Sequence, residues 1–159
     1  MDKVLKLLEE NARYTNEEIA VMLGRTADEV ADKIAQMERE GIIRGYKVIV
    51  DREKISDDYV SAIIELRVSP KRDFGFDEIA QTIAEYPEVE DVYLMSGGYD
   101  LALLISGRTF KDIALFVSQR LATLDSVLST ATHFVLSRYK EKGVPVHAVQ
   151  KDERRNVWL

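Results

Sequence analysis

The sequence contains no cysteine, and its 159 residues include only two histidines and one tryptophan. The absence of cysteine excludes disulfides, thiolate metal ligands and a cysteine nucleophile, and it fits a reducing cytoplasm. No apolar run approaches the roughly 18 residues that span a membrane. The N-terminus has Asp2 and then Glu9 and Glu10 where a signal peptide would have an apolar stretch. We therefore expect a cytoplasmic protein without a membrane partner.

Catalytic signatures are missing as well. His133 and His147 have no carboxylate at metal-ligand spacing, so the H-E-x-x-H pattern is absent. No G-x-S-x-G nucleophile turn occurs. Gly97 and Gly98 are not followed by the glycine and lysine of a phosphate-binding loop. The sequence predicts a protein that is not an enzyme and that holds no metal or cofactor.

Basic side chains are outnumbered by acidic ones, 22 to 28, and the formal net charge is -6. Residues 1–50 carry eight basic and ten acidic side chains, and residues 51–159 carry 14 and 18. DNA-binding proteins usually present a basic patch, so overall charge argues against nucleic acid and the local arrangement has to decide. Apolar residues make up 46% of the chain, which is enough for a packed core in one or two domains.

The first 44 residues predict three helices. Thr15 with Glu18, and Thr26 with Glu29, have the spacing of capping boxes at the start of the second and third helices. Gly41 would end the third helix. The apolar residues recur at helical spacing, and the inward-facing positions are Val4, Leu5 and Leu8, then Ile19, Ala20 and Leu23, then Val30, Ile34 and Met37.

The second and third helices have the spacing of a helix-turn-helix. Ala20 is small where the helices would cross, Gly24 accepts a left-handed turn, and Val30 is a branched anchor. The outer face of the third helix would then enter a major groove of double-stranded DNA. The candidate DNA contacts are Arg25, Thr26, Ala27, Glu29, Lys33 and Gln36, with Arg39, Arg44 and Lys47 at the edges.

The charge of the third helix favours an alternative function, a helical module that binds protein. Asp28, Glu29 and Asp32 would face phosphate unfavourably, and Lys33 is the only base within the helix before Arg39. Cations at the edges can still hold the DNA backbone on both sides of a groove. Linking several weak modules in one oligomer would also raise the overall affinity.

The remaining chain predicts a β-α-β-β-α-β order. Extended patterns cover residues 46–50, 59–68, 89–95, 101–106 and 130–138, and helical patterns cover 76–83 and 109–121. Residues 51–58 form a predicted linker, and residues 143–159 an irregular tail. The last four strands and two helices match the ferredoxin-like arrangement, so the fold class is α+β. The predicted inner face of the last helix is Phe110, Ile113, Ala114, Val117 and Leu121.

The turn at residues 96–100 is the candidate effector site. Gly97 and Gly98 would expose backbone N–H groups to a carboxylate, and Asp100 would accept from an ammonium group. Those are the two halves of an amino acid. The alternative is a tight turn in which Asp100 bonds its own backbone. The candidate effector contacts are Ser96, Gly97, Gly98, Tyr99 and Asp100, with Thr130 and Thr132 on the last strand.

A four-stranded sheet with helices on one face leaves its other face to be covered, which suggests self-association. The residues expected on that face are Ile63, Tyr93, Leu103, Ile105 and Phe134. The alternative is an ordinary one-sided sheet with scattered apolar residues.

Three segments carry a family resemblance. The stretch MEREGIIRGY at residues 37–46, within the helix-turn-helix of residues 15–50, resembles the winged helix-turn-helix of the leucine-responsive regulatory protein/AsnC family. The SGGYDL turn at residues 96–101 stands where that family has its G-x-Y-D signature, and residues 130–136 resemble its last strand. The resemblance covers about residues 1–142.

The resemblance implies a regulator of transcription built from two domains. It implies a winged helix-turn-helix over residues 1–50, whose strand at 46–50 pairs across a dimer, and a ferredoxin-like effector-binding and oligomerisation (RAM, ACT-like) domain over 59–142. It further implies an amino-acid effector bound around the turn between subunits, and dimers that assemble into octamers. The expected function is sequence-specific DNA binding that responds to an amino acid or related metabolite. The alternative is a ligand-sensing oligomer whose helical module binds protein.

Overall fold

The chain folds into two compact units, residues 1–48 and 49–159, in a computed structural model that describes residues 2–55, 58–70 and 75–146. The residue limits expected for the domains, the linker and the tail stay predictions. His147 and Trp158, in the expected tail, lie outside the described residues.

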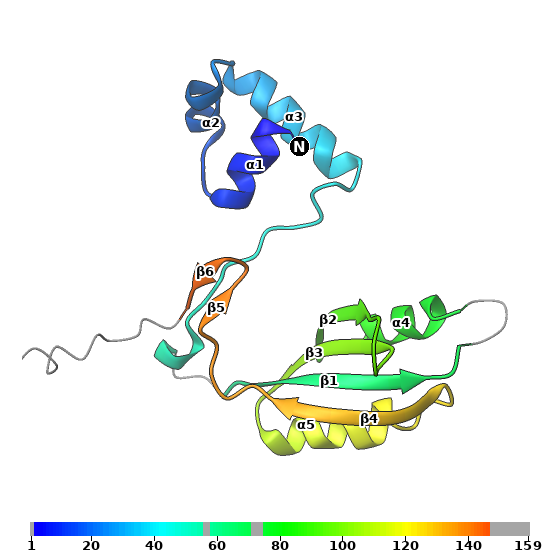
Figure 1. The fold of residues 1–159 in the computed structure, drawn as a ribbon. Coiled ribbons are helices and arrows are strands. Elements are labelled where there is room, and N and C mark those ends of the chain that lie inside the picture. The colour runs from blue at the N-terminus through cyan, green and yellow to red at the C-terminus, as the bar shows by residue number, and fades with distance from the viewer. Residues whose placement is uncertain (1, 56–57, 71–74, 147–159) are drawn as a thin grey trace, which may run out of the picture. The chain divides into compact units, whose positions relative to one another are not determined.

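The first unit is a three-helix unit, as the sequence predicts. It contains α1 (Lys3–Glu10), α2 (Asn16–Leu23) and α3 (Ala27–Arg39), shown in Figure 1. Both predicted capping boxes are present: in α2, the Glu18 N–H donates to Thr15 Oγ1 at 3.2 Å and the Thr15 N–H donates to Glu18 Oε2 at 2.8 Å. The core of the unit consists of Val4, Leu8, Ile19, Ala20, Val30 and Met37.

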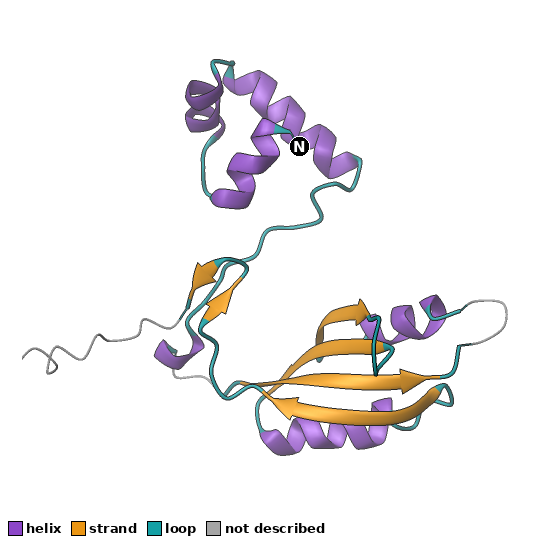
Figure 2. Cartoon of the chain, viewed as in Figure 1, coloured by secondary structure: helices purple, strands orange, loops and turns teal. Residues whose placement is uncertain are grey.

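The segment that follows α3 corrects one prediction. Residues 46–50, expected as a strand, form no strand in the described chain, and Figure 2 draws them as loop. A strand needs a neighbour that pairs with its backbone N–H and C=O groups. Because the described part of this single chain offers this segment no such neighbour, its extended pattern is not enough to form a strand. The segment is fixed to α3 by the Tyr46 hydroxyl, which donates to Glu38 Oε1 at 3.0 Å.

The second unit contains the predicted four-stranded sheet with two main helices. Its strands are β1 (Val60–Val68), β2 (Val89–Leu94), β3 (Leu101–Gly107) and β4 (Val127–Phe134), all antiparallel in the order β2-β3-β1-β4. The helices are α4 (Asp77–Ala84) and α5 (Phe110–Phe116), which continues as the π-helix η2 (Val117–Leu121), and a 3-10 turn, η1 (Arg52–Lys54), precedes β1 (Figure 1). This is the ferredoxin-like arrangement.

The core of the second unit lies on one side of the sheet. Alternate residues of β1 and β3 are buried there against α4, α5 and η2, because successive strand residues point to opposite faces. The fully or almost fully buried apolar residues of the strands are Ala62, Ile64, Leu66, Val68, Leu101, Leu103 and Ile105. The apolar alternation along residues 59–68 predicts that Ala62, Ile64, Leu66 and Val68 share one face of a strand, and the buried face of β1 confirms this.

The predicted uncovered face needs correction. Leu103 and Ile105 are 1% and 0% exposed, so they belong to the core and not to the uncovered face. Phe134 lies opposite the buried Ala62, and its ring contacts the ring of Phe110 in α5 with centroids 4.8 Å apart. Apolar alternation separates two faces of a strand but does not say which face the helices cover. Of the five residues expected on the uncovered face, only Ile63 and Tyr93 lie there. The strand register adds Leu104 to this face, because it pairs with Ile63.

The last helix confirms part of its predicted inner face, because Ile113, Val117 and Leu121 are buried as expected. Phe110 is 54% exposed and Ala114 is also exposed, whereas Phe116, which was not predicted, is buried. Ile113 anchors the helix, and the buried positions follow it at Phe116, Val117 and Leu121. Apolar residues stand on both sides of the buried stripe in this segment. The helical period alone therefore does not show whether Phe110 and Ala114 or Phe116 faces the core.

The chain after β4 also differs from its prediction. β4 starts at Val127 and ends at Phe134, where the sequence predicts 130–138. A hairpin of β5 (Lys140–Glu141) and β6 (Val144–Pro145) follows, so the expected irregular tail of residues 143–159 begins inside this hairpin. Lys142 and Gly143 have φ of 45° and 88°, and positive φ at both central residues favours a two-residue hairpin turn. Among the described residues, no helix is long and apolar enough to cross a membrane.

Candidate DNA-binding face and effector-binding turn

The turn between α2 and α3 has the geometry that a helix-turn-helix requires. Gly24 has φ +63°, a left-handed conformation that a side chain disfavours. The Arg25 N–H then donates to the carbonyl of Ala20 at 2.9 Å, which closes the end of α2. Ala20 and Val30 are 5% and 0% exposed, so the small residue and the branched anchor both lie in the core.

The outer face of α3 brings several candidate DNA contacts together. An open hollow of about 530 Å³ is lined by Arg25, Glu29, Asp32, Lys33, Gln36 and Arg39. Five of these are predicted contacts. Asp32 was expected only as an acidic residue of the helix, although its helical spacing from Glu29 and Gln36 is the signal that places it here. The other candidates, Thr26, Ala27, Arg44 and Lys47, do not line this hollow.

Thr26 and Glu29, two of the candidate DNA contacts, form the capping box at the start of α3. The Thr26 N–H donates to Glu29 Oε2 at 2.9 Å, and the Glu29 N–H donates to Thr26 Oγ1 at 3.2 Å. The hydrogen bond from the Thr26 backbone lowers the pKa of Glu29, which opposes the effect of desolvation, and Arg25 contributes to the same shift. The carboxylate therefore stays charged at the positive end of the helix dipole.

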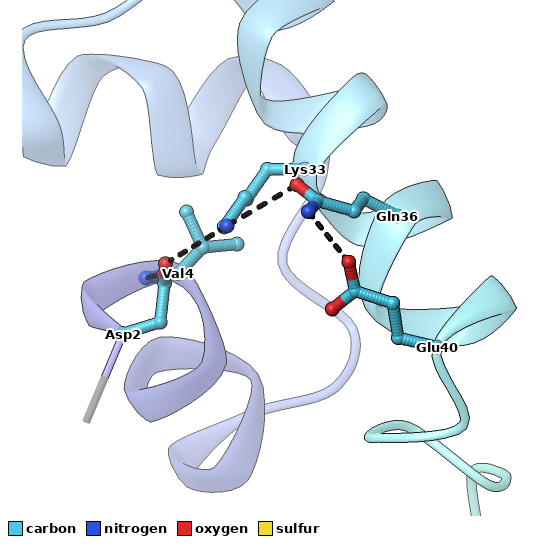
Figure 3. Close-up of polar contacts among 5 residues, drawn as sticks. All are labelled: Asp2, Val4, Lys33, Gln36 and Glu40. Carbon is cyan, nitrogen blue, oxygen red and sulfur yellow. Dashed lines mark hydrogen bonds and ion pairs between the residues drawn. The ribbon is translucent and has the colours of Figure 1, made fainter.

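Lys33 and Gln36 belong to a chain of polar contacts across α3 and α1, drawn in Figure 3. The Lys33 ammonium lies 3.6 Å from Asp2 Oδ2 and donates to Gln36 Oε1 at 3.3 Å. Gln36 Nε2 donates to Glu40 Oε1 at 2.7 Å. Desolvation would raise the pKa of Asp2, but the hydrogen bond from the Val4 N–H and the charge of Lys33 bring that pKa below its usual value.

Cations at the edges of α3 are exposed. Arg25 precedes the helix, Arg39 is its last residue, and Arg44 and Lys47 follow it. The guanidinium of Arg44 lies over Gly41, where an added Cβ would be 3.0 Å from it. Positive charge on both sides of a helix is the arrangement that can contact DNA backbone across a groove.

The turn between β2 and β3 is fastened to β1 by Asp100. The Asp100 N–H donates to the Leu66 carbonyl at 2.9 Å, and Asp100 Oδ2 accepts from the Val68 N–H at 2.8 Å. The Asp100 carbonyl accepts from the Met95 N–H at 2.8 Å, which closes the turn. The carboxylate therefore bonds a neighbouring strand, where the simple-turn alternative expected it to bond its own turn. Val68 lies beside the point where the register of β1 and β4 shifts.

The rest of the turn is open. A Cβ built on Gly97 or Gly98 would meet no atom within 4 Å. The Arg67 guanidinium lies over the Tyr99 ring, 5.3 Å from its centroid, in a cation–π contact. The turn thus combines exposed backbone, a fixed carboxylate and a cation on an aromatic ring.

Comparison with known proteins assigns both units. Residues 61–145 match the family model described as the Lrp/AsnC ligand binding domain, and residues 3–44 match the model of a winged helix-turn-helix DNA-binding domain. The chain belongs to the Lrp/AsnC family. The resemblance identified in the sequence is confirmed, and with it a helix-turn-helix transcriptional regulator that carries a ligand-binding domain.

Similar proteins agree with this assignment. An uncharacterised HTH-type transcriptional regulator of Bacillus subtilis is 44% identical over 153 residues, which cover 96% of this chain and 92% of the relative. The proline dehydrogenase transcriptional activator of Rhodobacter capsulatus is 26% identical over 90% of this chain and 92% of its own. A transcriptional regulator of Neisseria meningitidis, solved with L-methionine, shares the fold with a TM-score of 0.71, 24% identity, and coverage of 91% and 95%.

Within this Lrp/AsnC chain, the two candidate threonines lie apart from the Tyr99–Arg67 contact. Thr130 and Thr132 are opposite Leu66 and Ile64, whose side chains face the core. Because alternate residues share a face, both threonines project from the side that the helices cover. Arg67 projects from the uncovered side. Sequence reasoning missed Arg67, although its alternation with the buried residues of β1 was the available signal.

Proposed function

We propose that this Lrp/AsnC regulator binds specific DNA sequences with an affinity that responds to an amino acid or a related small metabolite, held at residues 96–100 between subunits. The observation that carries the proposal is the fixed carboxylate of Asp100. Its Oδ2 accepts from the Val68 N–H, and no hydrogen bond from another described residue reaches its Oδ1. One oxygen therefore holds the group in place while the other can meet a ligand.

The surroundings of Asp100 match the chemistry of an amino acid. An ammonium group would be attracted by the carboxylate, and a ligand carboxylate would accept from N–H groups of the open turn at Gly97 and Gly98. The Neisseria meningitidis neighbour was solved with L-methionine, and the Rhodobacter capsulatus relative is named for the activation of proline dehydrogenase. Both names support an effector of this class. The family of transcriptional regulators also favours DNA over protein as the partner of the helical unit.

Self-association completes the proposal. Ile63 and Tyr93, which are 44% and 47% exposed, lie with Leu104 on the sheet face opposite the helices. Burying such a face against a second copy removes apolar surface from water. We therefore expect dimers that assemble further, up to octamers. Light scattering coupled to gel filtration measures this, and a monomer at micromolar concentration would contradict it.

A thermal-shift screen of the whole chain against the common amino acids tests the effector. A ligand that binds the folded chain raises the melting temperature. Asp100→Asn keeps an oxygen for the Val68 N–H but loses the charge, so it should melt like the wild type without ligand and lose the shift. Asp100→Ala should lose both the bond and the shift. A full ligand shift in Asp100→Asn would exclude Asp100 from the site.

DNA binding is tested separately with a labelled duplex from upstream of the protein's own gene. Arg25→Ala removes an exposed cation at the start of α3 and should weaken binding and reduce the salt dependence by about one phosphate contact per subunit. Lys6→Ala removes the same charge from an exposed position of α1 and is the matched control. Equal binding by the wild type and Arg25→Ala would contradict this contact.

A further inference from the structure

The two oxygens of the Asp2 carboxylate have different partners. Oδ1 accepts from the Val4 N–H at 2.8 Å and so caps the start of α1. Oδ2 lies 3.6 Å from the Lys33 ammonium of α3 (Figure 3). The first contact belongs to the fold of α1. The second crosses to the helix that faces DNA in the proposed function.

The Lys33 ammonium has two partners, Asp2 of the N-terminus and Gln36 of its own helix. Besides Asp2, its ammonium contacts Gln36 Oε1 at 3.3 Å, and the amide nitrogen of Gln36 donates to Glu40 at 2.7 Å. The side chains of Lys33 and Asp2 are only 33% and 31% exposed, so solvent screens their attraction less than it screens a fully exposed pair. The lysine that would contact phosphate thus already has a carboxylate as its counterion.

The pairing of Lys33 with Asp2 matters because the first half of α3 is otherwise acidic. Asp28, Glu29 and Asp32 lie in its first half, and Lys33 is the only base between Ala27 and Gln36. The pair neutralises that base without removing any of the three carboxylates. A phosphate that approaches the hollow on α3 would meet Arg25 and Arg39 at its ends, and a neutralised lysine between them.

Resting on the proposed DNA-binding function, we infer that Asp2 limits the DNA affinity of this regulator by withholding the Lys33 ammonium from the phosphate backbone. Asp2 is then a residue that tunes affinity without touching DNA. Removing its charge while keeping its cap releases Lys33 for a phosphate contact.

Asp2→Asn separates the two roles of the carboxylate. Asparagine is as good a helix cap as aspartate, so its Oδ1 still accepts from the Val4 N–H, while an amide replaces the charge that faces Lys33. Its melting temperature should therefore fall only slightly, by the loss of one partly exposed ion pair and of a negative charge at the start of a helix. Its affinity for the labelled upstream duplex should rise about two- to fivefold per module, the range that corresponds to a partly exposed ion pair. The plot of log K against log salt should steepen by about one per module.

Two controls distinguish this effect from a general change of charge. Glu9→Gln makes the same change in net charge at an exposed position of α1, and it should raise affinity less than Asp2→Asn. In a Lys33→Gln background, Asp2→Asn should have no effect, because the cation that it releases is absent. The four proteins of this double-mutant cycle isolate the Asp2–Lys33 coupling.

The outcomes are distinct. Tighter binding by Asp2→Asn that disappears in the Lys33→Gln background supports the inference. Unchanged or weaker binding by Asp2→Asn, or a gain that persists without Lys33, overturns it while the proposed function stands, provided that Arg25→Ala weakens binding. A wild type that does not bind duplex DNA overturns the proposed function and the inference together.

Discussion

The helical unit and the sheet unit of this chain are specified by different kinds of signal. The helical unit buries six residues in its core, and its helices begin and end at local signals such as the Thr15–Glu18 box and Gly24. The described part of the sheet unit has thirteen apolar residues in its core, and its architecture depends on pairs such as Ile64 with Leu103, which are far apart in sequence. Local signals can be identified in a sequence, whereas a register depends on contacts between distant segments.

The largest expected effect tests the sheet unit at its centre. Ile64 is completely buried on β1, and Ile64→Ala removes three carbons from a packed core, so it should lower the free energy of unfolding by about 2–5 kcal/mol. Urea denaturation followed by circular dichroism measures this.

The neighbouring residue provides the matched control. Ile63 is 44% exposed on the opposite face of the same strand, so Ile63→Ala should cost well under half as much and should mainly weaken self-association. Equal losses of stability would mean that both faces of the sheet are equally important to the core, and they would contradict the one-sided packing of this unit.

The two units were also predictable to different extents. All three N-terminal helices are present, because capping residues and glycine stops act within one or two turns of the chain. In the second unit, element order and the shared apolar face of β1 are right, but Leu103 and Ile105 lie on the other side from the one expected. β3 is apolar on both faces, so its own pattern cannot show which face the helices cover; only its pairing with β1 settles this.

The sites show the same limit. The sequence predicts Gly24 and Arg25 at the helix-turn-helix and Asp100 at the turn, since those residue types carry their function locally. It does not predict that Asp100 bonds the backbone of Val68, or that Lys33 faces Asp2. Each of these pairs is more than 30 residues apart in sequence. Such contacts require the relative placement of two elements, which residue spacing alone does not give.

A smaller effect tests the local geometry of the helical unit. Gly24→Ala places a Cβ on a left-handed residue, and since that Cβ would meet nothing within 4 Å, the cost is conformational alone, about 1–2 kcal/mol. Gly24→Asn should cost less, because asparagine tolerates this conformation better. Gly45→Ala is the control: its Cβ also meets open space, and its backbone does not have a positive φ. Similar melting temperatures for Gly24→Ala and Gly45→Ala would show that the turn does not depend on glycine.

The smallest effect concerns the pH dependence of the capping box on α3. The hydrogen bond from the Thr26 N–H lowers the pKa of Glu29 below its usual 4.5 in the folded chain. A carboxylate with a lowered folded pKa contributes stability that is complete above its unfolded pKa and that disappears as the pH falls through the folded value. The contribution should therefore be present at pH 7 and decline below about pH 4.

Glu29→Gln isolates this contribution, because glutamine keeps an oxygen for the Thr26 N–H but does not titrate. The wild type should melt slightly above Glu29→Gln at pH 7, since a negative charge at the start of a helix is favourable, and the difference should shrink as the pH falls below about 4. Thermal melts followed at 222 nm across this range measure it, with high salt as a further check on the charge effect. A difference that stays constant with pH would mean that the box stabilises α3 by its hydrogen bonds alone. The local signal that predicts this helix would then be one of geometry, with no part played by charge.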